Sequence, residues 1–177
     1  MSLENAKANL KDFGAELNLK DLKFDDNNTC ILGIDNTFSL HLTYEPNSDR
    51  LYLYSPILDG LPKDDSTKLK LYEALLEGSM LGGQMAGGGI GVAVNEELIL
   101  MHCILEMGLG ADASSLRRFA PIFVEAVEKW RDRAKKILEG RDEPSDRSPQ
   151  IGGGDHRPGP KPGGGEHPKP GDRFIKI

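Results

Sequence analysis

The first half of the chain shows two hydrophobic spacings in succession. Apolar residues separated by three or four positions lie on one stripe of a helix, and the first such set is Leu3, Ala6, Leu10, Phe13 and Leu17. Ser2 precedes this set and is a favourable N-cap residue. The pattern predicts an amphipathic helix over residues 2–17.

From residue 22 to residue 54 the spacing changes to two, which is typical of strands with one buried face. Apolar and polar residues alternate over 30–34, 38–44 and 51–54, and a weaker strand is predicted at 22–24. Asp35-Asn36 suits a tight hairpin turn, and residues 45–49 form a longer polar loop. Connections this short favour an antiparallel meander.

Pro56 and Leu61-Pro62 are predicted to close this sheet segment. Residues 64–66 then give a helix-start signal, and the helix is predicted to end at Gly82-Gly83. Its apolar positions are Leu69, Tyr72, Leu75, Leu76 and Met80. Residues 92–95 and 98–105 follow as a predicted hairpin that turns at Asn95-Glu96.

Helical spacing returns from Leu116 to Leu138. Pro121 interrupts this run, so we expect either a kink or a short helix followed by a longer one. The complete order is α-β-β-β-α-β-β-α. It predicts an α+β fold with three main helices and a bent antiparallel sheet.

The composition divides the chain at residue 139. Residues 140–177 contain nine Gly and seven Pro and almost no apolar side chains, so they cannot bury enough surface to offset the entropy of ordering them. We therefore predict a folded domain over 1–139 and a disordered Gly/Pro-rich tail over 140–177. The tail ends in an apolar stretch, Phe174-Ile175-Lys176-Ile177.

The net charge narrows the classes of partner. The chain has 22 Lys and Arg against 28 Asp and Glu, a net charge of −6, and residues 1–139 alone carry 15 basic and 22 acidic side chains. An acidic domain repels phosphate backbones and anionic lipid headgroups, so we expect no nucleic acid and no membrane insertion. The N-terminus lacks the features of a secretion signal, and we expect a cytoplasmic protein.

Candidates for catalysis are few. The Gly-rich stretch 82–91 lacks the Gly-Lys-Ser/Thr ending of a phosphate-binding loop and lies between a helix and a strand, the reverse of the required order. We interpret it as a flexible connection. Cys30 and Cys103 lie in apolar runs, where a thiol usually behaves as a buried hydrophobe. We expect no metal and no cofactor, and keep a small hydrolase or transferase using Cys103 or His102 as the alternative.

The amount of apolar surface suggests association. Residues 98–105 are apolar on both faces of the predicted strand, so one face can meet a helix and the other needs a different cover. Together, the helices and strands offer more apolar surface than a 139-residue monomer easily hides. We therefore expect a dimer interface and a docking groove.

The ordered series of segments resembles the class I type III secretion chaperones of the CesT/SycE kind, and looks closest to members that serve several cargo proteins. The resemblance covers about residues 2–138 and is carried by residues 28–35, 38–42, 51–58, 71–82, 91–94 and 98–101. It implies a homodimer without catalytic activity. Such a dimer binds the N-terminal segment of effector proteins, keeps that segment unfolded for export, and lets it add a strand to the sheet edge.

The resemblance also implies partners and sites. The partners are secreted effector proteins, a second copy of the chain and the secretion ATPase. The first helix and first strands would bind cargo, through Leu10, Phe13, Leu17, Leu22, Phe24, Phe38, Leu40 and Leu42. The second helix and last strands would form the dimer interface, through Leu75, Leu76, Met80, Ile99 and Met101. A regulator that binds a secretion or transcription protein through the same grooves is a further alternative.

Overall fold

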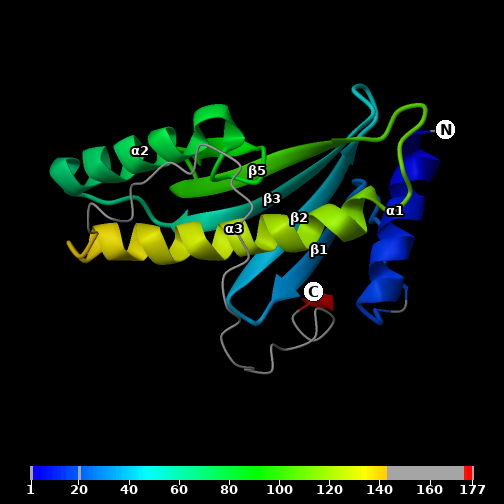
Figure 1. Cartoon of the computed structure of the whole chain (residues 1–177). Helices are drawn as coiled ribbons and strands as arrows, with labels where there is room; N and C mark the ends of the chain where they lie inside the picture. Colours follow the sequence, from blue (N-terminus) through cyan, green and yellow to red (C-terminus); the bar gives the residue numbers. More distant parts are fainter. Residues whose placement is uncertain (1, 20, 143–173, 177) are drawn as a thin grey trace, which may run out of the picture.

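The computed structural model describes residues 2–19, 21–142 and 174–176, the last three by their backbone. Figure 1 shows a sheet with the long helix α3 running along one of its faces. In chain order the elements are α1 (Ser2–Glu16), β1 (Thr29–Ile34), β2 (Phe38–Glu45), β3 (Arg50–Asp59), α2 (Asp65–Ser79), the short 3₁₀ helix η1 (Met80–Gly82), β4 (Gly89–Ala93), β5 (Leu98–Glu106), α3 (Ser115–Leu138) and β6 (Phe174–Lys176). The predicted α-β-β-β-α-β-β-α order is confirmed.

The strands form one antiparallel sheet in the order β4-β5-β3-β2-β1-β6. The hairpin between β1 and β2 turns at Asp35 and Asn36, which both have positive φ, 47° and 54°. Asp and Asn tolerate this left-handed conformation better than most residues. The turn predicted from these two residues is therefore confirmed, and it sets a register in which Leu32 faces Leu40.

One face of the sheet forms the hydrophobic core. The alternating residues of this face are buried: Cys30, Leu32 and Ile34 in β1, Leu40, Leu42 and Tyr44 in β2, Leu51, Leu53 and Ile57 in β3, and Ile99, Met101 and Cys103 in β5. They lie in register across the strands except at Ile57, where β3 shifts its register against β5. Buried residues from all three helices join the same cluster, including Phe13 of α1, Leu75 of α2 and Trp130 of α3. The helices therefore cover this one face.

The opposite face of the sheet carries the residues that alternate with the buried ones along each strand. Ile31, His41, Tyr54 and His102 lie side by side across β1, β2, β3 and β5. Each of these four side chains is only half-buried, in contrast to the fully buried residues on the core face. We call this surface the open face.

Two details of the predicted elements are wrong. Residues 22–24 form no strand, because Leu22 packs back against Gly14 of α1. β3 does not stop at Pro56 but continues to Asp59. Proline has no backbone N–H to donate to a neighbouring strand. Pro56 is tolerated because β2 pairs with β3 only as far as His41 opposite Tyr54, so no β2 carbonyl has to accept a hydrogen bond from residue 56.

Of the two alternatives for Pro121, the division into a short and a longer helix is wrong, because Pro121 lies inside a single helix, α3. Buried apolar residues stand on both sides of it, Ala120 before and Phe123 after, and both belong to the same core. Packing of this apolar stripe holds the helix together despite the hydrogen bond that proline cannot donate.

The Gly-rich stretch is packed, which differs from the flexible connection that the sequence suggests. Gly82 has a positive φ of 68°, and a Cβ at Gly88 would collide with the backbone carbonyl of His102 in β5. β4 then begins at Gly89. Glycine is needed here for close backbone approach.

Gly78 of α2 supports a test of how the helices are joined. A Cβ at this position would overlap the ring of Trp130, which is 1% exposed and donates a hydrogen bond from Nε1 to the Gln84 carbonyl at 2.9 Å. Alanine normally favours a helix over glycine by about 1 kcal/mol, but overpacking a core costs about 1–3 kcal/mol. We expect Gly78→Ala to lower the free energy of unfolding by about 1–2 kcal/mol in urea denaturation.

Gly108→Ala is the matched control, because a Cβ at Gly108 meets no atom within 4 Å. This control should change the free energy of unfolding by less than about 0.5 kcal/mol. Equal stability of Gly78→Ala and the wild-type chain would show that α2 does not rest on Trp130 as described.

Candidate functional site

A groove of about 610 Å³ lies at one end of the open face. We call it the open-face groove and define it by its lining side chains Phe38, His41, Tyr54, Pro56, Leu98, Leu100 and Arg131. They come from β2, β3, β5 and α3, so residues far apart in the sequence meet here. These side chains are mainly aromatic and aliphatic, and the polar residues Asn36, Thr37, Ser39 and Asp59 also line the groove beside the Arg131 guanidinium and the His41 imidazole.

The groove exists because β2 and β3 separate. Their pairing ends at His41 opposite Tyr54, so Pro56 of β3 and Thr37, in the turn before β2, lie beyond the paired part of these two strands. Arg131 of α3 enters this gap, and its two terminal nitrogens donate to the Pro56 carbonyl at 2.8 Å and the Thr37 carbonyl at 3.2 Å. Its guanidinium also lies over the Phe38 ring, 5.2 Å from the ring centre.

His41 supplies the groove with a neutral aromatic surface. Its ring stacks on Tyr54 with the ring centres 4.8 Å apart, and its Nε2 is 2.8 Å from the Ser39 hydroxyl. Burial lowers the pKa of His41 below 6.5, the ordinary histidine value. The imidazole is therefore uncharged at neutral pH and can contact apolar groups without the cost of desolvating a charge.

The β1 end of the sheet offers backbone groups for strand pairing. β1 pairs with β2 over its whole length, from Thr29 to Ile34. On its other side it pairs with β6 only from Leu32 to Ile34. Because an edge strand presents unpaired N–H and C=O groups, it is a template for an additional strand.

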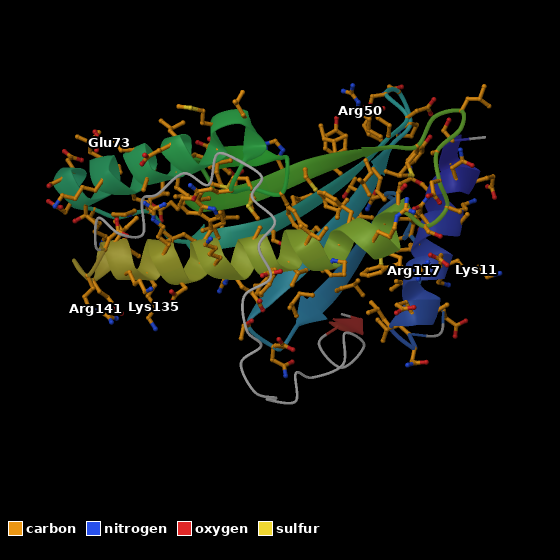
Figure 2. All side chains as sticks on the ribbon, in the orientation of Figure 1. Lys11, Arg50, Glu73, Arg117, Lys135 and Arg141 are labelled. Carbon is orange, nitrogen blue, oxygen red and sulfur yellow. The ribbon has the colours of Figure 1, made fainter. Side chains whose placement is uncertain are left out.

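A second apolar surface lies on α2, η1 and β4, on the side away from α3. We call it the α2–β4 surface and define it by Leu69, Leu76, Met80, Leu81, Val92 and Val94, which are 39–99% exposed. Leu69 and Leu76 form one stripe of α2, opposite the buried Leu71 and Leu75, and Met80 at the start of η1 continues this stripe. Figure 2 shows Glu73, which belongs to the same stripe by its spacing, pointing away from the body of the chain.

The structure places most predicted cargo-binding residues in the core. Leu10, Phe13, Leu17, Leu22, Leu40 and Leu42 are all 0–8% exposed, whereas Phe24 and Phe38 are partly buried. The cargo-binding role predicted for the six buried residues is corrected accordingly: alternation identifies their face, and the helices cover that face. Of the eight, only Phe38 lines the open-face groove.

The predicted dimer residues divide in the same way. Leu76 and Met80 are each 69% exposed and belong to the α2–β4 surface, whereas Leu75, Ile99 and Met101 are at most 1% exposed. The interface role predicted for these three buried residues is corrected, because the chain's own core surrounds them. Leu69, Leu81, Val92 and Val94, which the sequence analysis does not nominate, are the additional residues of the α2–β4 surface.

The residues considered for catalysis are poorly placed for it. Cys30 and Cys103 are both buried free thiols, and burial raises the pKa of Cys103 to about 12. A thiol with this pKa is not the thiolate that nucleophilic catalysis needs. Within residues 2–19 and 21–142, no group of three or more His, Cys, Asp and Glu side chains is arranged to hold a metal ion.

The comparisons with known proteins agree with this geometry. The sequence matches the Tir chaperone protein (CesT) family over residues 8–131, which is more than half of the chain. The chain belongs to this family. No curated protein matches the sequence.

Three solved structures share the fold of this CesT-family chain. The HopA1-SchA chaperone-effector complex matches with 26% identity and a TM-score of 0.57, covering 73% of this chain and 97% of that one. The ExsC-ExsE complex matches with 13% identity and a TM-score of 0.59, covering 73% and 92%. The Yersinia pestis type III secretion chaperone SycH, in complex with a stable fragment of YscM2, matches with 14% identity and a TM-score of 0.53, covering 71% and 98%.

Within the described part of this CesT-family chain, no helix is both long and apolar enough to cross a membrane.

Arg131 gives the most direct test of how the groove is built. Replacing it with methionine keeps much of the aliphatic stem but leaves the Pro56 and Thr37 carbonyls without their donor. We expect Arg131→Met to lower the free energy of unfolding by about 1–2 kcal/mol in urea denaturation, because hydrogen bonds to a charged group are lost at a half-buried site. Lys135→Met, at an exposed position of the same helix, should have little effect. If both variants unfold alike, Arg131 does not hold the groove together.

Proposed function

We propose that this chain is a cytoplasmic type III secretion chaperone that binds the N-terminal segment of effector proteins and keeps it unfolded and competent for export. The observation that carries this proposal is the open face, an aromatic and aliphatic sheet surface that the helices leave uncovered. Membership of the CesT family supports it. The HopA1-SchA complex, a chaperone with its effector, shares the fold at 26% identity.

The open face suits an extended segment better than a folded domain. Its row of Ile31, His41, Tyr54 and His102 crosses four strands, so a bound segment meets a long, shallow surface and not one deep cavity. The groove around Leu100 can take an apolar side chain, while the β1 edge can pair with the backbone of the segment. Backbone pairing gives affinity for many sequences and side-chain pockets give preference among them, which suits a chaperone with several cargo proteins.

Charge favours the same kind of ligand. Residues 1–139 carry 15 basic and 22 acidic side chains, so the domain attracts polar or basic segments and stays soluble while apolar surface is exposed. Within the groove, Arg131 already bonds to backbone carbonyls. Its charge is therefore engaged by the protein and does not demand an acidic ligand.

We propose a second copy of this chain as the occupant of the α2–β4 surface. The exposed stripe of α2 lies beside β4, a strand at the end of the sheet with pairing on one side only. A two-fold axis would bring the same stripe and edge from both copies together, which is how most homodimers are built. Pairing would cover these exposed leucines and leave the two open faces available for cargo.

The location, the absence of a catalytic step and a further partner follow from the proposed chaperone function. A protein that keeps a segment unfolded before export acts in the cytoplasm, and it performs binding without a catalytic step. It must also release its cargo at the secretion apparatus, so we propose the secretion ATPase as a further partner. A regulator of secretion or transcription would use the same surfaces, and the identity of the captured protein distinguishes the two functions.

The dimer is tested by Leu76→Glu. Leu76 is 69% exposed in the single chain, so the substitution should leave the fold intact while placing an unpaired carboxylate in the interface. We expect at least a tenfold, or about 1.4 kcal/mol, loss of dimer affinity in analytical ultracentrifugation. Ile122→Glu is the control, because Ile122 of α3 is 56% exposed and lies outside the α2–β4 surface. A Leu76→Glu dimer as tight as the control would refute the assignment.

Cargo binding is tested by co-purification from cells that express candidate secreted proteins, with mass spectrometry to identify what the chain retains. We expect secreted proteins that bind through their N-terminal segments. A chain that retains no secreted protein, or retains only a transcription regulator, would contradict the chaperone function.

The site is then tested with the identified segment. Leu100→Asp puts a charge into the open-face groove at a half-buried position, and we expect at least about a tenfold loss of affinity by calorimetry. Circular dichroism should show an unchanged fold. Unchanged binding by Leu100→Asp would mean that the segment lies elsewhere.

A further inference from the structure

The last residues of the chain pair with the β1 edge. β6 (Phe174–Lys176) is antiparallel to β1, with Ile34 opposite Phe174, Gly33 opposite Ile175, and Leu32 opposite Lys176. Figure 1 shows this short strand, in red, beside the sheet at its β1 end. The sheet therefore receives its sixth strand from a segment more than 30 residues beyond α3.

The sequence of this segment is suited to the position. Residues 172–177 read Asp-Arg-Phe-Ile-Lys-Ile, in which an aromatic residue and two β-branched residues follow a stretch with eight Gly and seven Pro between positions 143 and 173. Aromatic and β-branched residues favour strands, whereas Gly and Pro do not. Strand-forming residues thus return at the point where the chain meets an edge strand.

We propose that residues 174–176 are a built-in occupant of the β1 edge, bound in cis, which an incoming cargo strand must displace. This inference rests on the proposed function, because it assigns a regulatory role to the edge that cargo would use. The occupant is an extended segment of the chain itself. It covers an edge that would otherwise be free to pair with other chains and cause aggregation.

The extent of the pairing makes displacement feasible. β6 covers three residues of β1, from Leu32 to Ile34, while β1 begins at Thr29. The backbone N–H and C=O of Thr29 already bond to Asp25, so a longer cargo strand would begin pairing at Ile31, beside the covered residues, and replace β6 one residue at a time. A tethered segment competes at an effective concentration that can reach the millimolar range, so a short strand in cis can weaken cargo binding without preventing it.

The experiment compares the full chain with a variant that stops after Arg173. The probe is a fluorescent peptide with the sequence of residues 172–177, so no cargo needs to be known. We expect the truncated chain to bind this peptide about tenfold more tightly than the full chain, because the edge is vacant and no tethered competitor remains. The same peptide with Ile175→Pro is the matched control. It should bind the truncated chain more weakly, since proline cannot donate a backbone hydrogen bond.

Hydrogen exchange provides the second readout. Backbone amides within residues 32–34 should exchange several-fold faster in the truncated chain than in the full chain, while those in the core of α3 should not change. Equal peptide binding by the two chains, or equal exchange at β1, would overturn the inference. So would protection of β1 that increases with protein concentration, because the strand would then come from another copy.

The outcome is separable from that of the proposed function. If the truncated chain binds the peptide but no secreted protein is captured, the edge is self-occupied and the chaperone function fails. If secreted proteins are captured equally by both chains and the peptide does not bind, the function stands and the occupant is rejected.

Discussion

The sheet of this chain is covered by helices on one face, and that asymmetry determines what the rest of the molecule can do. α1, α2 and α3 all contribute to a single core with the alternating residues of β1, β2, β3 and β5. The other half of the alternation, including His41 and Tyr54, is only half-buried. Its polar groups satisfy one another laterally, as the Thr29 and Thr43 hydroxyls do at 2.9 Å. A surface of this kind is stable in water and retains apolar area that a ligand can bury.

Two adjacent residues of α3 connect the core to both proposed interaction surfaces. Trp130 packs against Gly78 and so holds α2 in place, with its exposed stripe directed outward. Arg131 leaves the helix in another direction, enters the gap between β2 and β3, and bonds to Pro56 of β3 and to Thr37 in the turn before β2. The groove and the α2–β4 surface are therefore positioned by the same helix. We infer that the long α3 provides rigidity, while the sheet and α2 provide the contacts.

Alternation in the sequence predicted the strands, the hairpin at Asp35-Asn36 and the order of elements, because local spacing and turn chemistry determine these. It does not tell which apolar residues face a partner and which face the chain's own helices. Leu40 and Leu42 form the apolar half of their strand, opposite Ser39, His41 and Thr43, and the family resemblance assigns them to a cargo surface although they are core. The neighbours Leu75 and Leu76 show the same limit on a helix, since one is buried and the other 69% exposed. The separation of β2 and β3 around Arg131 is a tertiary feature that leaves no local signal in the sequence. The pairing of β6 with β1 is likewise not predictable from the spacing of apolar residues.

The central claim is that an extended segment of another protein lies on the open face. Site-specific photo-cross-linking tests this claim most directly. A photoreactive phenylalanine analogue would replace Tyr54 on the open face or, in a separate variant, Ile122 on the exposed side of α3. With an effector that co-purifies, the account predicts cross-links from position 54 to residues in the effector's N-terminal segment and none from position 122. Cross-links from position 122 and none from position 54 would contradict this claim.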